Sequence, residues 1–236
     1  MPIRTSTLSH NSLTAHMARP DAPSDRGLLL LPMITGVGER VREFAADFAG
    51  AGITTVCWNP FPGASSDTHS LEELRQRRDE LDDRTVLEEL KSWLDHMSDE
   101  LGVRRTATVG YCLGGRFALL LAAADPRIAG LVAYHPTVPP TPEKNHSIDP
   151  FEEAARVDTP VLVHYPGQDH LVPRQSMDRL RTMLEANTSA SVTVSVHPEA
   201  GHGFSDSAHH GNEHNVAAYS LAQPLTLAFL RSTLAQ

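Results

Sequence analysis

Short apolar runs alternate with amphipathic stretches along most of the chain. The runs are a few residues long and rich in aliphatic and β-branched side chains, which is typical of strands buried on both faces of a sheet. They lie at residues 27–34, 53–58, 106–111, 128–135, 161–165 and 191–197. The stretches with helical spacing lie at residues 37–51, 71–101, 115–124, 173–186 and 215–234. This alternation predicts an α/β fold, with a mostly parallel central sheet and helices on both faces.

Two segments depart from this regular pattern. The N-terminal segment at residues 1–27 contains the first of them, residues 13–20. Polar and apolar residues partly alternate there and the segment ends in a proline, which predicts an antiparallel strand that leads into a loop. Residues 136–151 carry five prolines and cannot form a regular element, so we expect a loop that acts as a lid over the strand ends. We expect residues 1–236 to form one domain.

Composition and charge exclude several classes of partner. The chain is 40% apolar and carries 20 basic against 29 acidic residues, a formal net charge of −9. A negative surface repels polyanions, so we expect no nucleic-acid partner and no binding to an anionic membrane. The longest apolar runs, at residues 28–34 and 117–124, are far shorter than the roughly 20 residues of a membrane helix.

The cysteine count and the N-terminal composition bear on the compartment. Two cysteines, Cys57 and Cys112, are too few for a disulfide framework, and Cys57 reads as a buried apolar residue of a strand. The first 27 residues have no apolar core of the kind that a secretory signal needs. We therefore expect a cytoplasmic protein, and a monomer.

The strongest chemical signal is a glycine-rich turn between a predicted strand and a predicted helix. Residues 110–115 read Gly-Tyr-Cys-Leu-Gly-Gly, which matches a nucleophile elbow with Cys112 in the nucleophile position. The flanking glycines fit a sharp turn where a side chain would collide with its neighbours. The start of a helix also favours an anion, and therefore a thiolate. The alternative is a tight turn around a buried cysteine; the strand and helix on either side favour the elbow.

A thiol nucleophile needs a base and a group that orients the base. Asp169 follows the strand at residues 161–165, and the glycine-flanked His202 follows the strand at residues 191–197. Nucleophile, acid and histidine occur in the chain order of α/β-hydrolases, so we expect His202 rather than His170 to be the base. The backbone N–H groups of Leu113 and Ile34 are expected to form the oxyanion hole.

At these residues the sequence resembles the dienelactone hydrolase family of α/β-hydrolases. The resemblance extends from about Leu13 to the C-terminus and includes the segments LTAHMARP and LLLLPMITG as well as the elbow. It implies an α/β-hydrolase fold and a cofactor-free hydrolase that cleaves a small-molecule ester or lactone. The resemblance also implies that Cys112 is the nucleophile, that His202 is the base and that Asp169 orients His202.

The sequence departs from the family pattern at two places. Met33 stands where the family commonly has a glutamate that interacts with the thiol, so we expect Cys112 to rest as a thiolate paired with protonated His202. Asp206 follows His202 where dienelactone-specific members have an arginine for the substrate carboxylate, which favours a neutral ester, lactone or similarly activated acyl or phosphoryl compound. We expect the pocket to be lined by Phe61, Tyr111, His135, Phe151 and Phe204. The mixed-charge run at residues 72–80 is expected to face solvent.

Two other classes of function stay open at this stage. A hydrolase-fold sensor could capture electrophiles on Cys112 without turnover, since the family glutamate is missing. Alternatively, His202, His209, His210 and His214 could form a metal-binding cluster. Their irregular spacing matches no known zinc motif, so we expect no metal at this site.

Overall fold

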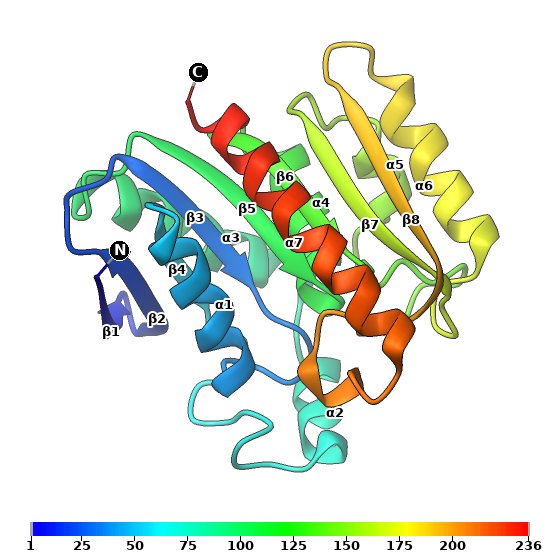
Figure 1. The fold of residues 1–236 in the computed structure, drawn as a ribbon, viewed down its shortest axis with the longest axis horizontal. Coiled ribbons are helices and arrows are strands. Elements are labelled where there is room, and N and C mark those ends of the chain that lie inside the picture. Colours follow the sequence, from blue (N-terminus) through cyan, green and yellow to red (C-terminus); the bar gives the residue numbers. More distant parts are fainter. Residues whose placement is uncertain (1, 236) are drawn as a thin grey trace.

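The computed structural model describes residues 2–235 and contains an eight-stranded sheet, in the order β1-β2-β4-β3-β5-β6-β7-β8 (Figure 1). The strands are β1 (Ile3–His10), β2 (Leu13–Pro20), β3 (Arg26–Leu31), β4 (Thr54–Trp58), β5 (Arg105–Tyr111), β6 (Ile128–Tyr134), β7 (Val161–Gln168) and β8 (Val192–Gly201). The six strands β3 to β8 pair in parallel, whereas β2 runs antiparallel to β4 and to β1. The predicted α/β class is therefore confirmed.

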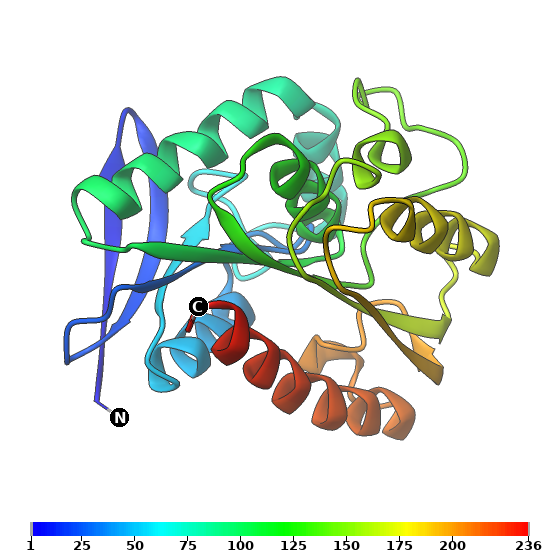
Figure 2. The same cartoon turned by 90° about the horizontal axis from the view of Figure 1, so that it is seen from above.

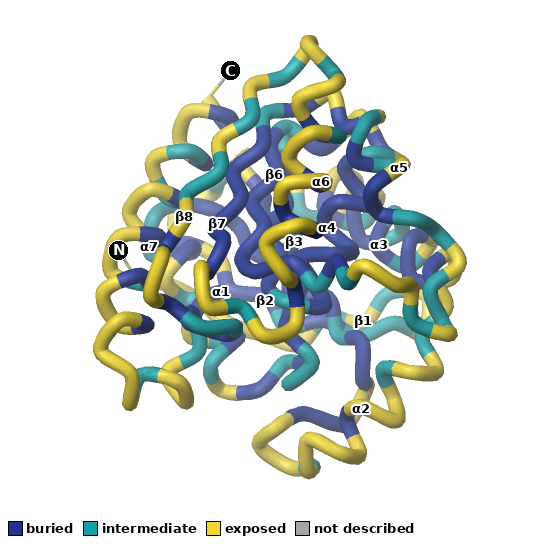
Figure 3. The backbone as a smooth tube through the Cα atoms, turned by 90° about the vertical axis from the view of Figure 1, so that its right-hand side faces the viewer, coloured by how far each residue is buried: buried dark blue, intermediate teal, exposed yellow. Residues whose placement is uncertain are grey.

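Helices cover both faces of the sheet (Figure 2). On one face lie α1 (Glu39–Gly50) and α7 (Glu213–Thr233). The other face is covered by α3 (Asp83–Asp99), α4 (Leu113–Ala124), α5 (Pro150–Ala154) and α6 (Arg174–Ala186). The short helix α2 (Leu71–Asp79) lies beyond the carboxyl ends of the strands (Figure 1). The central strands are buried between the two layers, while the outer surfaces of the helices are exposed (Figure 3).

The N-terminal strand β1 was not predicted. Its sequence, IRTSTLSH, has almost no buried residue, so it lacks the apolar face that marks a strand in sequence. It forms because its backbone pairs with β2 along its whole length, from Ile3 opposite Pro20 to His10 opposite Leu13. Asn11 and Ser12 make the turn with φ of 48° and 68°, values that suit a tight hairpin.

Several element boundaries differ from the prediction. The charged stretch at residues 71–101, for which one helix or two were expected, forms two. The helix α4 begins at Leu113, directly after the nucleophile turn, rather than at Gly115. The proline-rich segment is irregular as far as Asp149, whose side chain caps α5, and Pro150 occupies the first turn of that helix. Within residues 2–235, no helix combines the length and the apolar composition that crossing a membrane requires.

Candidate active site

The turn between β5 and α4 has the backbone conformation of a nucleophile elbow. Cys112 has φ of 52° and ψ of −113°, a conformation that non-glycine residues rarely adopt. A Cβ on Gly110 would lie 2.1 Å from the carbonyl oxygen of Gly114, and a Cβ on Gly114 would lie 2.2 Å from the carbonyl oxygen of Leu31. Only glycine fits these two positions, and the tight turn leaves the Cys112 side chain partly exposed at the carboxyl edge of the sheet.

The loops after β7 and β8 bring an acid and a histidine to this thiol. Nε2 of His202 lies 3.1 Å from Sγ of Cys112, and Nδ1 of His202 lies 2.9 and 3.1 Å from the carboxylate oxygens of Asp169. The side chain of Asp169 is fully buried and that of His202 is 8% exposed. A carboxylate can only accept the hydrogen bond from Nδ1, so Nε2 is the nitrogen that exchanges a proton with the thiol.

The electrostatics of this pair favour separated charges. Burial raises the pKa of Cys112, but the charge of His202 and hydrogen bonds from His202, Thr137 and the Leu113 N–H together hold it below its ordinary value. Burial lowers the pKa of His202, but the negative charge of Cys112 and the hydrogen bond to Asp169 raise it to about 10. Both directions indicate a thiolate beside an imidazolium at neutral pH.

The two residues expected to form an oxyanion hole both line the cavity beside Cys112. Leu113 is the first residue of α4, and Ile34 lies in the loop after β3; both line the same cavity as Cys112. The Gly114 N–H donates to the carbonyl oxygen of Pro32 at 3.0 Å, which holds the Ile34 loop against the start of α4. The N–H groups at the start of a helix have no partner within the helix. That of Leu113 interacts with Cys112 in this structure.

A cavity of about 310 Å³ opens above the thiol. The proline-rich loop forms one wall with Thr137, Pro139, Glu143 and His146, and α2 forms another with Leu71, Arg75 and Arg78. The sequence predicted that the proline-rich loop would lie over the strand ends, but it gave no indication of the α2 wall. The run at residues 72–80 was expected to face solvent; Arg75 is exposed as expected, whereas Arg78 is half-buried, and both line the cavity because α2 lies across the strand ends.

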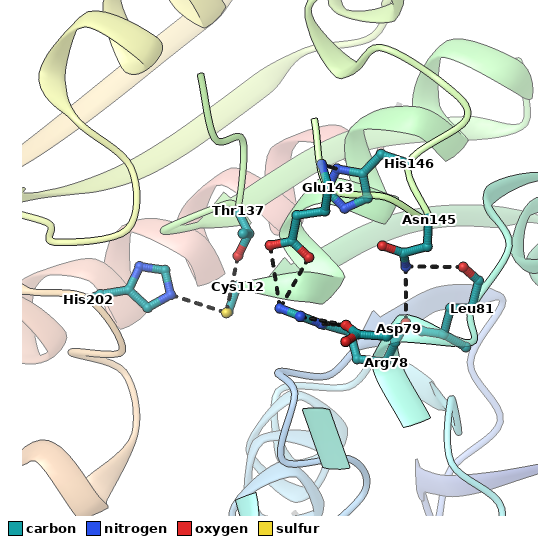
Figure 4. A network of polar contacts seen from close by, with 9 residues as sticks. All are labelled: Arg78, Asp79, Leu81, Cys112, Thr137, Glu143, Asn145, His146 and His202. Atoms are coloured by element: carbon teal, nitrogen blue, oxygen red, sulfur yellow. Dashed lines mark hydrogen bonds and ion pairs between the residues drawn. The ribbon is translucent and has the colours of Figure 1, made fainter. Parts of the chain in front are cut away.

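The loop and the helix are held together by polar contacts (Figure 4). Nη1 of Arg78 lies 3.2 Å from the Glu143 carboxylate, and the Asn145 side chain donates to the carbonyl oxygens of Arg78 and Leu81 at 3.0 and 3.1 Å. Thr137 Oγ1 also lies 3.2 Å from Sγ of Cys112 (Figure 4). Thr137 carried no sequence signal because it sits in a loop without periodicity.

The sequence profile of the dienelactone hydrolase family matches residues 13–234. The chain belongs to this family. A carboxymethylenebutenolidase of Rhodococcus opacus is 32% identical over 189 residues, which cover 79% of this chain and 73% of the relative. Carboxymethylenebutenolidase 2 of Cupriavidus pinatubonensis is 33% identical over 180 residues, 75% of this chain and 72% of the relative. A dienelactone hydrolase-like promiscuous phosphotriesterase from metagenomic libraries shares the fold, with a TM-score of 0.76, 18% identity and 98% of each chain covered.

In this dienelactone hydrolase family member, Met33 stands where the resemblance leads us to expect a glutamate. Met33 is buried and belongs to the apolar core between the sheet and α1, against which Cys112 also packs. Its thioether carries no charge that could accept a proton from the thiol or repel a thiolate. The partners that polarise Cys112 are therefore His202 and Thr137.

The five residues predicted to line the pocket do not line the cavity above Cys112. All are almost fully buried: Phe61, Tyr111, His135, Phe151 and Phe204. Tyr111 illustrates the reason. Its ring stacks between Phe44 and Tyr134, at centroid distances of 4.5 and 4.7 Å, on the opposite side of the sheet from the cavity. Burial of a large ring in the core stabilises the fold more than its exposure at the wall of a small cavity would.

The four histidines considered as a metal cluster are separated in the structure. His209 lines the cavity, His210 bonds the carbonyl oxygen of Phe204 at 3.0 Å, and His214 lies in the first turn of α7. Among residues 2–235, the set of potential metal ligands that does come together is Cys112, His135 and His202. A metal-binding role for the cluster at residues 202–214 is therefore not supported.

Proposed function

We propose that this hydrolase cleaves an ester or lactone through a covalent intermediate on Cys112. The observation that carries the proposal is the continuous chain of contacts from Cys112 through His202 to Asp169, at the floor of a cavity that also receives the N–H groups of Leu113 and Ile34. This arrangement supports the assignment of a nucleophile, a base, an orienting acid and oxyanion donors. Membership of a hydrolase family favours turnover over electrophile capture.

The arrangement supports a two-step reaction. The Cys112 thiolate attacks the carbonyl carbon, and the N–H groups of Leu113 and Ile34 stabilise the negative charge on the carbonyl oxygen. The intermediate collapses when His202 gives its proton to the departing alkoxide, which leaves a thioester on Cys112. His202 then takes a proton from water, the hydroxide attacks the thioester, and the acid product and the thiolate are released. Asp169 stabilises the charged imidazole in both steps.

The charges around the cavity favour a neutral substrate. Every guanidinium group that lines the cavity has an acidic partner among the described residues. The N–O distances are 3.9 Å for Arg75 and Glu72, 3.2 Å for Arg78 and Glu143, and 2.6 Å for Arg116 and Asp83. A substrate carboxylate would compete with these acidic partners.

A lactone that carries a carboxylate is the second candidate. The two relatives described above are named carboxymethylenebutenolidase, and the Arg78 side chain is about a quarter exposed beside the cavity. To distinguish the two candidate substrate classes, kcat/KM is measured for one lactone whose carboxyl group is either free or blocked as a methyl ester. The proposal expects the methyl ester to be preferred, and Glu143→Gln to improve the free acid selectively because it frees Arg78.

The first experiment follows p-nitrophenyl acetate through the first seconds with wild type and Cys112→Ala, and records intact mass in parallel. The proposal expects steady turnover in wild type and none above background in the variant. One burst with a stable acetyl group on Cys112 would identify capture without hydrolysis. Equal rates in the two proteins would refute the cysteine mechanism.

The same proposal concerns where and in what form the protein acts. A thiolate nucleophile needs a reducing environment, and both cysteines are free, which favours the cytoplasm. The site is built from one chain, which is compatible with a monomer. Light scattering of the purified chain tests the oligomeric state, and fluorescence microscopy of the tagged chain in its source cell tests the location.

A further inference from the structure

His135 is a buried histidine directly behind the catalytic histidine. It follows β6 with φ of 36°, has no exposed surface, and its ring packs edge-on against the ring of His202 at a centroid distance of 4.8 Å. No step of the proposed hydrolysis uses it. A non-glycine residue with positive φ at a fully buried position is costly, and such positions cluster at functional sites.

The ring nitrogens of His135 differ in their surroundings. Nε2 lies 2.9 Å from the hydroxyl oxygen of Ser205, whereas buried Nδ1 has no hydrogen-bond partner among the described residues. If Nε2 donates its proton to Ser205, the lone pair remains on Nδ1. His202 has the same division, because its Nδ1 donates to Asp169 and its Nε2 faces the thiol. His135 then presents a lone pair on Nδ1, and His202 presents one on Nε2 once the proton that it shares with Cys112 has left; each ring is oriented by a partner on its other nitrogen.

The three donor atoms are close enough to share one ion. Sγ of Cys112, one nitrogen of His202 and one nitrogen of His135 all lie within 4.8 Å of one another, and the Cys112–His202 distance is 3.1 Å. An ion placed at equal distances from the three atoms would therefore lie at most about 2.5 Å from each of them. Zinc bonds to nitrogen and sulfur are about 2.0–2.3 Å long. Shifts of a few tenths of an ångström would complete the coordination. The adjoining cavity leaves room for water as a fourth ligand.

We propose that Cys112, His135 and His202 form an inhibitory zinc site. A thiolate and two imidazoles are ligands that zinc prefers, and hydrogen bonds from ligating histidines to a carboxylate or hydroxyl are typical of its sites. The bound ion holds the nucleophile and the base, so it competes with substrate. Binding displaces the proton shared by Cys112 and His202 to solvent, one for each ion. The inhibition rests on the proposed function, whereas the binding does not.

The test is a zinc titration of the purified chain in competition with a chromogenic chelator, together with cobalt substitution. The expected result is one ion per chain, a thiolate-to-cobalt charge-transfer band, and inhibition competitive with p-nitrophenyl acetate. His135→Asn removes the third ligand while tolerating positive φ, and it should weaken zinc binding at least tenfold. For each variant, inhibition by zinc is measured relative to the rate of the same variant without zinc.

A matched control is His170→Asn. His170 lines the same cavity, and its ring lies 5.9 Å from that of His202, but it is outside the three-ligand set. Its substitution should leave zinc affinity unchanged. If His135→Asn does not fold, Ser205→Ala provides a second variant, which removes the partner of Nε2 and should weaken binding about tenfold.

Equal zinc affinity in His135→Asn and His170→Asn would overturn the proposal, because the ion would then be held by Cys112 and His202 alone. Absence of stoichiometric zinc binding would overturn it as well. A chain that binds zinc through His135 but does not turn over ester would leave the metal site intact and refute the proposed hydrolysis. Turnover without zinc binding would do the reverse.

Discussion

The carboxylate of Asp169 accepts a hydrogen bond from Nδ1 of His202 and is itself fixed by the backbone. Its Oδ1 atom accepts the N–H groups of Leu171 and Val172 at 2.8 and 3.0 Å, while the two oxygens lie 3.1 and 2.9 Å from the imidazole. The turn after β7 thus sets the position of the acid, and the acid sets the orientation of the ring that faces Cys112. This dependence makes the Asp169–His202 contact the most sensitive point of the site.

Replacement of Asp169 by Asn should lower kcat/KM for p-nitrophenyl acetate about 1,000- to 10,000-fold. An amide NH2 directed at the ring stabilises the tautomer with its proton on Nε2, which can no longer accept the thiol proton. Steady-state kinetics measure the loss. Asp158→Asn is the matched control, since Asp158 is exposed and lies in a loop before β7. A loss below tenfold in Asp169→Asn would remove Asp169 from the mechanism.

Alkylation by iodoacetamide should modify Cys112 and spare Cys57. The pKa of Cys112 is lowered, so its thiolate persists to lower pH than that of an ordinary thiol. The rate should therefore rise much less between pH 7 and pH 9 than that of a thiol of ordinary pKa, which rises about 20-fold. Burial raises the pKa of Cys57 and shields it from reagent. Intact mass and peptide mapping identify the modified residue.

The variant His202→Asn supplies the control for this pH profile. It removes the positive charge and the hydrogen bond of His202, without which the remaining hydrogen bonds do not offset the effect of burial on Cys112, so the thiol pKa should rise and the alkylation rate should climb between pH 7 and pH 9. A wild-type rate that climbs as steeply as that of the variant would contradict the thiolate–imidazolium pair.

Most of the fold was predictable because it rests on burial. The strands β3, β5 and β7 lie inside the sheet, so their apolar runs are long enough to recognise. The exposed edge strand β1 is held by backbone pairing with β2, which leaves no mark in its side chains. The pattern of hydrophobic residues therefore predicts the elements that are buried in the core. It does not predict a strand that is held only by main-chain hydrogen bonds.

The candidate site was predictable where backbone geometry restricts the sequence. The elbow around Cys112 needs glycine at Gly110 and Gly114, and the order of Asp169 and His202 along the chain follows from the order of the strands. The cavity walls were not predictable in this way. Arg78 and Glu143 lie 65 residues apart in sequence and meet only because α2 and the proline-rich loop cross the same edge of the sheet.

Loss of the buried Arg116–Asp83 pair should destabilise the protein strongly. Both side chains are 1% exposed, and Nη1 and Nη2 of Arg116 donate to the two oxygens of Asp83 at 2.6 and 2.8 Å. Arg116→Met leaves the Asp83 carboxylate buried without its counter-ion and should lower the free energy of unfolding by about 3–5 kcal/mol. Urea denaturation at pH 7 measures the change.

The double variant Arg116→Met/Asp83→Asn tests this explanation. Asp83 also accepts the N–H groups of Ser147 and Ile148 at 2.8 and 2.9 Å, and an asparagine oxygen can still accept them. With no buried charge left over, the double variant should be more stable than Arg116→Met alone. Equal or lower stability would mean that the cost comes from lost packing rather than from an unpaired carboxylate.

Buried neutral histidines should make the protein unstable in mild acid, and His164 provides the clearest test. Burial, with a smaller contribution from His197, lowers the pKa of His164 to about 3, while its pKa in the unfolded chain is about 6.5. Below pH 6.5 the unfolded state therefore binds a proton that the folded state does not, and stability falls by about 1.4 kcal/mol for each pH unit. Between pH 6.5 and pH 5 this amounts to about 2 kcal/mol.

The variant His164→Gln removes the titrating ring while an amide can still reach Thr226, whose Oγ1 lies 3.0 Å from Nε2 of His164. It should be less stable than wild type at pH 7 but should lose about 2 kcal/mol less between pH 7 and pH 5, as measured by urea denaturation. His214→Gln, at an exposed position in α7, should behave as wild type at every pH. If His164→Gln keeps the full wild-type pH dependence, the acid sensitivity arises from other groups and this explanation fails.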